Sequence, residues 1–370
     1  MKSSLSRKEL DRIGDTIVSP DASIRDGWKA LWRIEEWRAS FSLPMRATSM
    51  MLKNAALRID PRVIVSRRLK RMEAIIAKLE RGASVHGKLS TIQDIGGCRV
   101  VFPLIDHVGA FANINKSILE NENLSIRNNY ILKPKEDGYR GIHAILHYKA
   151  NNPRYADWNG KKIEIQIRTQ VQHCWATALE TVDLFLNQKL KWGKGDPKWQ
   201  RFFILASAAF ATYEGTPAVP NTPKADALRL ELRLLWRELD VLHKLTGWSR
   251  AVSSSEDVLS QRVMPPLAQP ATTFLVVMDI NRRELRITPY SNEEMGFANQ
   301  DYAKQEQQIR DGYEAYAVLV SVEDIRMLRD AYPNFYADTD MFVSGVRHFI
   351  GERGIDFAPM QAFPQSRNSV

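Results

Sequence analysis

The sequence predicts an α+β protein in which a mixed β-sheet is flanked by helices, followed by a small C-terminal α+β domain. Three observations predict this class. Apolar residues recur at helical spacing in the first 64 residues. Short apolar strands alternate with helices in the next third of the chain. A segment rich in Ser and Pro then precedes a second group of strands.

We expect five consecutive regions along the chain. They are a helical region at 1–64, the sheet domain at 65–190, a helical extension at 191–252, a linker at 253–273 and the C-terminal domain at 274–370. In the first region, "ASIRDGWKALWRIEEWRASF" places Ile24, Trp28, Leu31, Trp32 and Ile34 near helical spacing. "PRVIVSRRLKRMEAIIAKLERG" is predicted to be a single helix, with Pro near its start and Gly after its end.

The remaining elements follow from the same patterns. Expected strands are "GCRVVFP", "SIRNNYIL", "IHAILHYK", "KKIEIQIRT", "TFLVVMDI", "RRELRITPY" and "AYAVLVSV". Expected helices are "DHVGAFANINKSILEN", "QVQHCWATALETVDLFL" and the ranges 197–213, 223–247, 323–331 and 338–350.

Composition narrows the class of protein. The chain is 44% hydrophobic and 26% charged, which is typical of soluble globular proteins. No apolar run is long enough to cross a membrane, and the N-terminus lacks the apolar core of a secretory signal. Cys98 and Cys174 are too few for a disulfide framework or a zinc site. We therefore expect a cytoplasmic protein with no membrane partner.

The net charge of +9 is unevenly distributed. Residues 1–90 contain 19 Lys or Arg against 10 Asp or Glu, whereas residues 265–370 contain 10 against 15. Two ordinary solvated surfaces would explain this. Alternatively, a basic half binds phosphates, and an acidic C-terminal domain competes with a polyanionic substrate.

Three stretches contain residues suited to phosphate chemistry. In "SRRLKRMEAIIAKL", Arg68, Lys70 and Lys78 could line one side of a helix and bind phosphates, or simply form a solvated face. Asp94 precedes one strand and Glu164 lies inside another. Two carboxylates that converge at a sheet edge commonly hold Mg²⁺ together with nucleotide phosphates. The alternative is that both are ordinary surface or strand-face acids.

The third stretch is the loop "KPKEDGYRGIH", from Lys133 to His143. Its cationic and aromatic side chains suit a phosphate cradle with a ring for base stacking; they are Lys133, Lys135, Tyr139, Arg140 and His143. No GxxxxGK[ST] motif occurs, so the chain is not a Walker-type NTPase, and no HExxH occurs.

Taken together, these stretches resemble the RelA/SpoT synthetase domain, the alarmone pyrophosphokinase family. The resemblance runs from about Val65 to Phe185 and includes "QDIGGCRVV", "YILKPKEDGYRGIH", "IEIQIRT" and "QHCWATALE", in register. It implies a nucleotidyltransferase-like fold and transfer of the β,γ-pyrophosphate of ATP to a ribose 3′-hydroxyl, with Mg²⁺ as cofactor.

The resemblance also implies residue roles. Arg68 and Arg99 would sandwich the adenine, and Lys70 and Lys78 would hold the ATP phosphates. Asp94 would bind Mg²⁺, and Glu164 would complete the metal site or activate the hydroxyl. Tyr139 would stack on the acceptor base. The acceptor's phosphates and ribose would be positioned by Lys133, Lys135, Arg140, His143, Gln166 and Arg168.

The chain looks like a small alarmone synthetase, and most like the fused toxin–antitoxin branch of the CapRel kind. In that branch the acceptor is the 3′ CCA end of tRNA, and a C-terminal antitoxin domain restrains the toxin until a phage protein binds. Tyr313 and Tyr316 have the YxxY spacing that blocks the ATP site there, although two such tyrosines beside a strand are often core residues.

Alternatives remain for the acceptor, for the catalytic role and for the C-terminal domain. The acceptor could be GDP or GTP, since the Tyr139 loop suits a guanine. The basic N-terminal region favours tRNA, because an extended polyanion releases counterions on binding. The fold could also serve as a non-catalytic nucleotide or RNA sensor. The C-terminal domain could be autoinhibitory, a partner sensor or an oligomerisation element.

Overall fold

An eight-stranded mixed sheet runs through the part of the chain that the computed structural model describes. The described residues are 5–82, 87–119, 124–186, 188, 190, 193, 195–249, 273–279, 282, 284–321 and 339–352. The strands are β1 (Ile64–Leu69), β2 (Gly96–Phe102), β3 (Leu124–Asn129), β4 (Ile142–His147), β5 (Lys162–Thr169), β6 (Thr273–Asp279), β7 (Glu284–Tyr290) and β8 (Ala315–Ser321). Their order is β3-β4-β5-β2-β1-β8-β6-β7, and only β2 and β5 pair in parallel. The predicted α+β class with a mixed sheet is confirmed.

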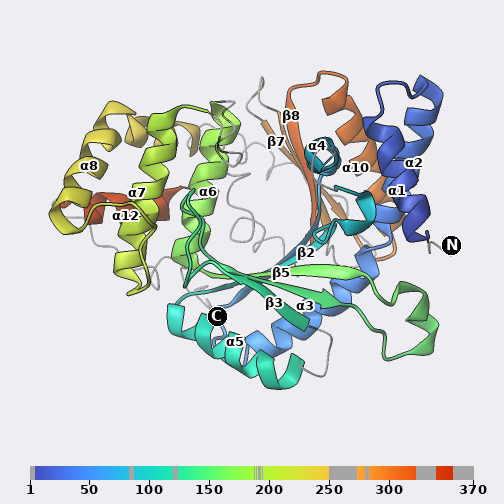
Figure 1. Ribbon diagram of the computed structural model, residues 1–370, viewed down its shortest axis with the longest axis horizontal. Coiled ribbons are helices and arrows are strands. Elements are labelled where there is room, and N and C mark those ends of the chain that lie inside the picture. The colour runs from blue at the N-terminus through green and yellow to red at the C-terminus, as the bar shows by residue number, and fades with distance from the viewer. Residues whose placement is uncertain are drawn as a thin grey trace, which may run out of the picture.

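Helices surround this sheet on three sides (Figure 1). They are α1 (Arg7–Val18), α2 (Ile24–Ala39), α3 (Ser42–Ala56), α4 (Met72–Gly82), α5 (Ile105–Leu119), α6 (Gln170–Phe185), α7 (Pro197–Tyr213), α8 (Ala225–Glu238), α10 (Met295–Arg310) and α12 (Asp340–Phe349). Figure 1 shows α6, α7, α8 and α12 grouped on one side, α1, α2, α4 and α10 on the other, and α3 and α5 beneath the sheet. None of the described helices combines the length and apolarity that crossing a bilayer requires.

The prediction of one helix over residues 61–82 was wrong. The structure places β1 at Ile64–Leu69 and begins α4 only at Met72. The run Val63-Ile64-Val65 is β-branched, a composition that favours a strand. Pairing of β1 with β2 and with β8 then decides the outcome. The later part of the predicted segment is helical, and Met72, Ile75 and Leu79 of α4 are buried.

The helix expected within residues 22–41 is confirmed as α2, Ile24–Ala39, but its buried face differs from the expected apolar positions. Ile24, Trp28 and Trp32 are 82%, 52% and 64% exposed, whereas Ile34 and Arg38 are fully buried.

The single helix expected at 223–247 is interrupted, because Asp240 adopts a positive φ of 50° between α8 and a helical segment at 241–249. The expected helix at 323–331 and nearly all of the expected linker at 253–273 lie outside the described residues.

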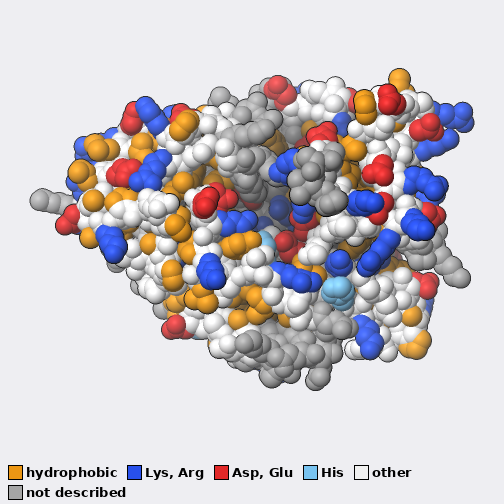
Figure 2. Space-filling view, in the orientation of Figure 1, with side chains coloured by type: hydrophobic (Ala, Val, Ile, Leu, Met, Phe, Trp, Pro, Cys, Tyr) orange, Lys and Arg blue, Asp and Glu red, His pale blue; other side chains and the backbone are white. Residues whose placement is uncertain are grey.

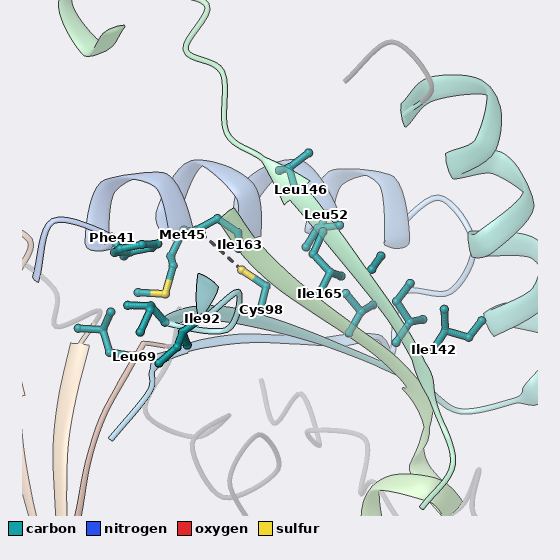
Figure 3. Close-up of a cluster of buried hydrophobic side chains, with 14 of the residues drawn as sticks. Phe41, Met45, Leu52, Leu69, Ile92, Cys98, Ile142, Leu146, Ile163 and Ile165 are labelled. Atoms are coloured by element: carbon teal, nitrogen blue, oxygen red, sulfur yellow. Dashed lines mark hydrogen bonds between the residues drawn. The ribbon is translucent and has the colours of Figure 1, made fainter. Parts of the chain in front are cut away.

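The main hydrophobic core lies between one face of the sheet and α3 (Figure 3). Met45 and Leu52 of α3 and the nearby Phe41 pack against side chains of β2 and β5. The Cys98 thiol donates to the carbonyl of Met45, with a sulfur–oxygen distance of 3.7 Å. Burial raises the pKa of this thiol to about 12, so Cys98 is a neutral core residue at physiological pH.

Strand pairing, an ion pair and aromatic packing all join the described part of the C-terminal third of the chain to the rest. β8 pairs with β1, with Arg67 opposite Ser321 and Arg68 opposite Val320. Helix α10 packs beside α2 through a buried ion pair between Arg38 and Glu306. Helix α12 inserts Phe342 among the aromatic rings of α7. The three strands of this segment therefore continue the sheet of the preceding domain.

Candidate functional site

The face of the sheet opposite the α3 core carries most of the predicted site residues. Side chains alternate along a strand, so residues whose neighbours fill the core project to the other face. Cys98, Ile163, Ile165 and Ile167 belong to the core. The residues that alternate with them share the opposite face with Arg68 of β1 and His143 of β4; they are Arg99, Glu164, Gln166 and Arg168.

Strand register brings these side chains together. Arg99 of β2 lies beside Gln166 of β5, which also pairs with His143 of β4. Glu164 lies beside Gly97, where the absence of a side chain leaves room next to the carboxylate. Figure 2 shows that this side of the molecule is hollowed at its centre, with basic and acidic side chains on the floor of the hollow.

Asp94 is held by two lysines. Its carboxylate lies 2.7 Å from Lys70 Nζ and 3.1 Å from Lys78 Nζ, and the Asp94 side chain is 20% exposed. Burial would raise the pKa of Asp94, but the two ammonium groups bring it below its ordinary value. Burial also lowers the pKa of Lys70, against the opposing effect of Asp94. The cluster thus joins the end of β1, helix α4 and the residues before β2.

Glu164 is the centre of a second cluster. Its Oε1 lies 3.2 Å from His143 Nδ1, and its Oε2 accepts a hydrogen bond of 2.9 Å from Gln166 Nε2. Burial would raise the pKa of Glu164, but the hydrogen bond and charge of His143 outweigh it, so the pKa is lowered. The negative charge of Asp94 acts in the opposite direction, which shows that the two carboxylates influence each other. Glu164 is therefore ionised at neutral pH.

The two carboxylates fit a metal ion that arrives with a nucleotide. No group of three or more potential ligands among His, Cys, Asp and Glu occurs within the described residues. Mg²⁺ is usually held by only one or two protein carboxylates, with phosphate oxygens and water completing its octahedron. Asp94 and Glu164 match that number and type of ligand, and Lys70 and Lys78 place two cations beside Asp94.

The loop between β3 and β4 forms an aromatic and cationic wall. Tyr139 Oη and His143 Nε2 are 2.7 Å apart, and the ring of Tyr130 packs edge-on against both residues. The ammonium of Lys135 lies 4.7 Å from the Tyr130 ring centre and 5.3 Å from that of Tyr139. Lys133 is exposed beyond this wall. The predicted association of Lys135, Tyr139 and His143 is therefore present.

Close packing holds this loop against α6 and α7. Gly138 has a φ of +94°, and its carbonyl accepts a hydrogen bond of 2.5 Å from Ser207 Oγ. A Cβ atom at Gly138 would lie 2.9 Å from the Trp175 ring and 3.3 Å from the carbonyl of Phe203. Both the backbone angle and the lack of space require glycine here.

Arg140 is not part of the open face. Its side chain is buried, donates to Thr216 Oγ1 at 2.8 Å, and lies 2.8 Å from Glu214 Oε2. Glu214 also accepts hydrogen bonds from Thr169 and Gln172 at the start of α6. The expectation that Arg140 contacts the acceptor is corrected: a buried guanidinium needs a fixed partner, and here Arg140 ties the loop to α6 and α7.

The other predicted residues occupy the polar face. Arg168 donates to Gln166 Oε1 at 3.3 Å and is nearly buried, as is Arg99. Arg68 lies in β1 between Gly97 of β2 and Val320 of β8. Several of the predicted residues thus form two clusters, one around Asp94 with Lys70 and Lys78, and one around Glu164 with His143 and Gln166.

The two YxxY tyrosines have different environments. Tyr313 is 39% exposed, and its hydroxyl donates to Asp279 Oδ2 at 2.5 Å, so it stabilises the turn before β8. Tyr316 of β8 packs against the apolar cluster between the sheet and α6. The guanidinium of Arg71 lies 5.5 Å from the Tyr316 ring centre. Only Tyr316 therefore adjoins the segment that carries Lys70.

Several residues that shape the site were not predicted from the sequence. Glu214 ends α7 and resembles any exposed helix-terminal acid until its buried contacts are seen. Tyr130 lies in the same loop as Tyr139, and the aromatic spacing could have indicated it. Arg38 and Glu306 lie in helices far apart in the sequence, and no local pattern relates them.

Comparison with known proteins identifies the type of domain. Residues 67–182 match the family model described as "Region found in RelA / SpoT proteins". This range contains both carboxylate clusters and the aromatic loop. Residues 67–182 of this chain are therefore similar to the RelA/SpoT region, as the resemblance predicted.

Two curated proteins are also similar to this chain in sequence. GTP pyrophosphokinase YjbM of Bacillus subtilis (strain 168) is 28% identical over 123 residues, and GTP pyrophosphokinase YwaC of the same strain is 33% identical over 125 residues. Each alignment covers 32% of this chain, and 54% and 57% of the respective relative. The chain thus spans about half the length of the curated relatives it matches.

Solved structures of small alarmone synthetases are also similar. The crystal structure of small alarmone synthetase 1 from Bacillus subtilis is 22% identical and covers 50% of this chain and 93% of its own, with a TM-score of 0.40. Small alarmone synthetase 2 from the same organism is 22% identical and covers 56% and 98%, with a TM-score of 0.38.

Proposed function

We propose that this chain is an ATP-dependent pyrophosphokinase that transfers the β,γ-pyrophosphate of ATP to a ribose 3′-hydroxyl. One observation carries the proposal: a Lys70–Asp94–Lys78 cluster lies near enough to a His143–Glu164 pair for Asp94 to influence the charge of Glu164, and both lie inside the range that matches the RelA/SpoT region. The first cluster suits a nucleoside triphosphate with Mg²⁺, and the second suits a hydroxyl that must lose its proton.

The reaction forms one bond and breaks one bond. The hydroxyl oxygen of the acceptor attacks the β-phosphorus of ATP, the bond from that phosphorus to the α,β-bridging oxygen breaks, and AMP leaves. The hydroxyl proton passes to Glu164, whose lowered pKa keeps it ionised and ready to accept. When bound to Asp94 and Glu164, Mg²⁺ would neutralise phosphate charge.

The protein's own side chains provide positioning and charge. Lys70 and Lys78 exchange part of their interaction with Asp94 for the phosphates of ATP. Arg68 and Arg99 lie on the adjoining surface and sandwich the adenine. Pyrophosphoryl transfer requires mainly alignment and charge neutralisation, which this arrangement supplies.

We propose the 3′ CCA end of tRNA as the acceptor, which would make the chain an inhibitor of translation. Support comes from the excess of Lys and Arg over acids in residues 1–90. Arg25, Lys29 and Arg33 of α2 are exposed and would contact an extended polyanion. A mononucleotide requires no such surface.

GDP or GTP is the second candidate acceptor. The compact group of Tyr130, Lys135, Tyr139 and His143 is large enough for one base and its phosphates. The names of the two curated relatives, both GTP pyrophosphokinases, favour the same acceptor. The product would then be a (p)ppGpp alarmone.

We further propose that the C-terminal segment restrains the enzyme, as an antitoxin fused to its toxin, until a phage protein binds it. Support comes from the excess of acids in residues 265–370 and from Tyr316, whose ring lies next to Arg71 beside the phosphate-binding lysine. Restraint through this contact would limit access of ATP to Lys70.

The decisive experiment uses the full chain with Mg²⁺ and γ-³²P-labelled ATP, offered GDP, GTP and deacylated tRNA separately. It is run on the wild type and on Tyr316→Ala, which removes the proposed restraint without altering a reacting group. Label on tRNA alone supports the toxin, and label on GDP or GTP supports the alarmone synthetase. ATP binding without transfer by either protein would replace the enzyme with a nucleotide sensor. Asp94→Asn controls for contaminating activity.

A further inference from the structure

A buried charge cluster formed by α2 and α10 lies next to the segment between β1 and α4. Arg38 of α2 is fully buried, and its Nη2 lies 2.5 Å from Glu306 Oε2 of α10 and 2.6 Å from Glu35 Oε2. The ring of Tyr302 lies 4.8 Å from the guanidinium carbon. Such a cluster is costly to bury unless its geometry is fixed, so its remaining contacts are informative.

Those remaining contacts reach the segment between β1 and α4. Arg38 Nη1 donates to the carbonyl of Lys70 at 3.0 Å, and Glu306 Oε1 accepts from the backbone N–H of Met72 at 2.9 Å. Met72 is the first residue of α4, whose opening N–H groups have no partner within the helix. A carboxylate there also interacts favourably with the helix dipole.

These bonds fix both lysines that face Asp94. Lys70 is held at each side, since its N–H donates to the carbonyl of Ile95 at 2.8 Å and its carbonyl accepts from Arg38. Lys78 lies on α4, whose first turn is anchored by Glu306. The two ammonium groups meet Asp94 at 2.7 and 3.1 Å. A shift of the α4 start would move both.

From this geometry we propose that Glu306 and Arg38 are positioning residues for the phosphate-binding lysines Lys70 and Lys78. Helix α10 then contributes to the geometry of the ATP site. This role is separate from the proposed restraint of the enzyme by the C-terminal segment. The inference rests on the proposed function only in taking ATP as the ligand of these lysines.

Glu35 provides a matched control for Glu306. Both carboxylates contact the same nitrogen of Arg38, but only Glu306 also binds the start of α4. Glu35→Gln keeps the size of the side chain and leaves the bond from Met72 to Glu306 in place. Glu306→Asp is a second variant: it keeps the charge that balances Arg38 but is one methylene too short to reach both Arg38 and Met72.

The test measures binding of α,β-methylene-ATP with Mg²⁺ to the full chain by calorimetry. We expect Glu306→Gln and Glu306→Asp to raise the Kd at least tenfold, and Glu35→Gln to change it less than twofold. In transfer assays, the KM for ATP should rise in the Glu306 variants while the KM for the acceptor stays within twofold. Amide exchange at Met72 should accelerate in both Glu306 variants and remain slow in Glu35→Gln.

The outcomes separate this inference from the proposed function. Failure of both the wild-type and the Tyr316→Ala protein, in which the proposed restraint is removed, to bind the analogue overturns ATP as the ligand, and the proposed function with it. Wild-type binding together with a folded Glu306→Asp protein of unchanged Kd overturns the positioning role alone. Equal rises in the KM values for ATP and acceptor would likewise overturn it, because they indicate a general structural effect.

Discussion

His143 Nδ1 lies 3.2 Å from Glu164 Oε1, while the opposite ring nitrogen of His143 lies 2.7 Å from the Tyr139 hydroxyl. The imidazole therefore links the aromatic wall of the loop to the carboxylate that we propose as the proton acceptor. Both ring nitrogens of His143 have a partner, so the orientation of the ring is fixed. The hydrogen bond at one nitrogen then determines whether the other nitrogen carries a proton.

Replacing His143 should change the pH dependence of transfer. Burial raises the pKa of Glu164, and the hydrogen bond and charge of His143 are the main effects that lower it. In His143→Ala the pKa of Glu164 should rise, so the acidic limb of the kcat/KM profile should move to higher pH. His143→Gln keeps an amide donor and should restore part of the difference. An unmoved limb in His143→Ala would show that Glu164 is not the titrating base.

Asp94→Asn should abolish transfer and alter the pH dependence of stability. We expect a loss in kcat of roughly hundredfold or more, in the range seen when one preorganised electrostatic group is removed. The pKa of Asp94 is lowered in the folded state, so its ion pairs stabilise the fold above the ordinary Asp range. That contribution is lost as pH falls through the folded pKa. Urea midpoints measured against pH should therefore fall less steeply at acid pH in Asp94→Asn than in wild type.

Gly138→Ala should weaken acceptor binding as well as stability. Gly138 and Gly160 both have positive φ, +94° and +82°, but a Cβ at Gly160 would meet nothing within 4 Å. Gly160→Ala should therefore cost only the backbone strain, about 1–2 kcal/mol. Gly138→Ala adds the contact with Trp175 and should cost more. Chemical denaturation compares the two, and only Gly138→Ala should raise the acceptor KM.

The Arg140–Glu214 pair should contribute more to stability than to acceptor affinity. Removing one member of a buried ion pair typically costs about 3–5 kcal/mol, because the other charge is left without a partner. Glu214→Gln should therefore lower the unfolding free energy substantially. Adding Arg140→Met to it should recover part of the loss. The exposed Lys133→Ala should leave stability unchanged. A stable Arg140→Met protein with a raised acceptor KM would instead favour direct contact with the acceptor.

The sequence predicted strands β2 and β5 correctly but not the neighbouring strand β1. Gly96–Phe102 and Lys162–Thr169 alternate or run apolar in ways that specify strands, so the common face of Glu164 and Gln166 could be expected. Residues 64–69 satisfy helical spacing equally well, and only their pairing with β2 and β8 distinguishes the two states.

Buried ion pairs were the second feature that could not be predicted from the sequence. Arg140 stands in a loop of cationic residues and was grouped with them, although its partner Glu214 lies at the end of a helix in another region. Arg38 and Glu306 are 268 positions apart, and a charged residue within a helix normally indicates a solvated face. Such pairs depend on tertiary contacts that local patterns do not contain.

The paired strands β1 and β8 differ in the side chains that they carry. If the C-terminal strands were withdrawn, β1 would become an edge strand that presents Arg67 and Arg68, and positive charge on an edge opposes pairing with other chains. The opposite edge, on β8, carries Val318 and Val320, both fully buried in the intact sheet. Separation of β1 from β8 would therefore leave the β1 edge protected by its charges and the β8 edge prone to aggregation. A chaperone or a binding protein that covers β8 would then determine whether the two strands can pair again.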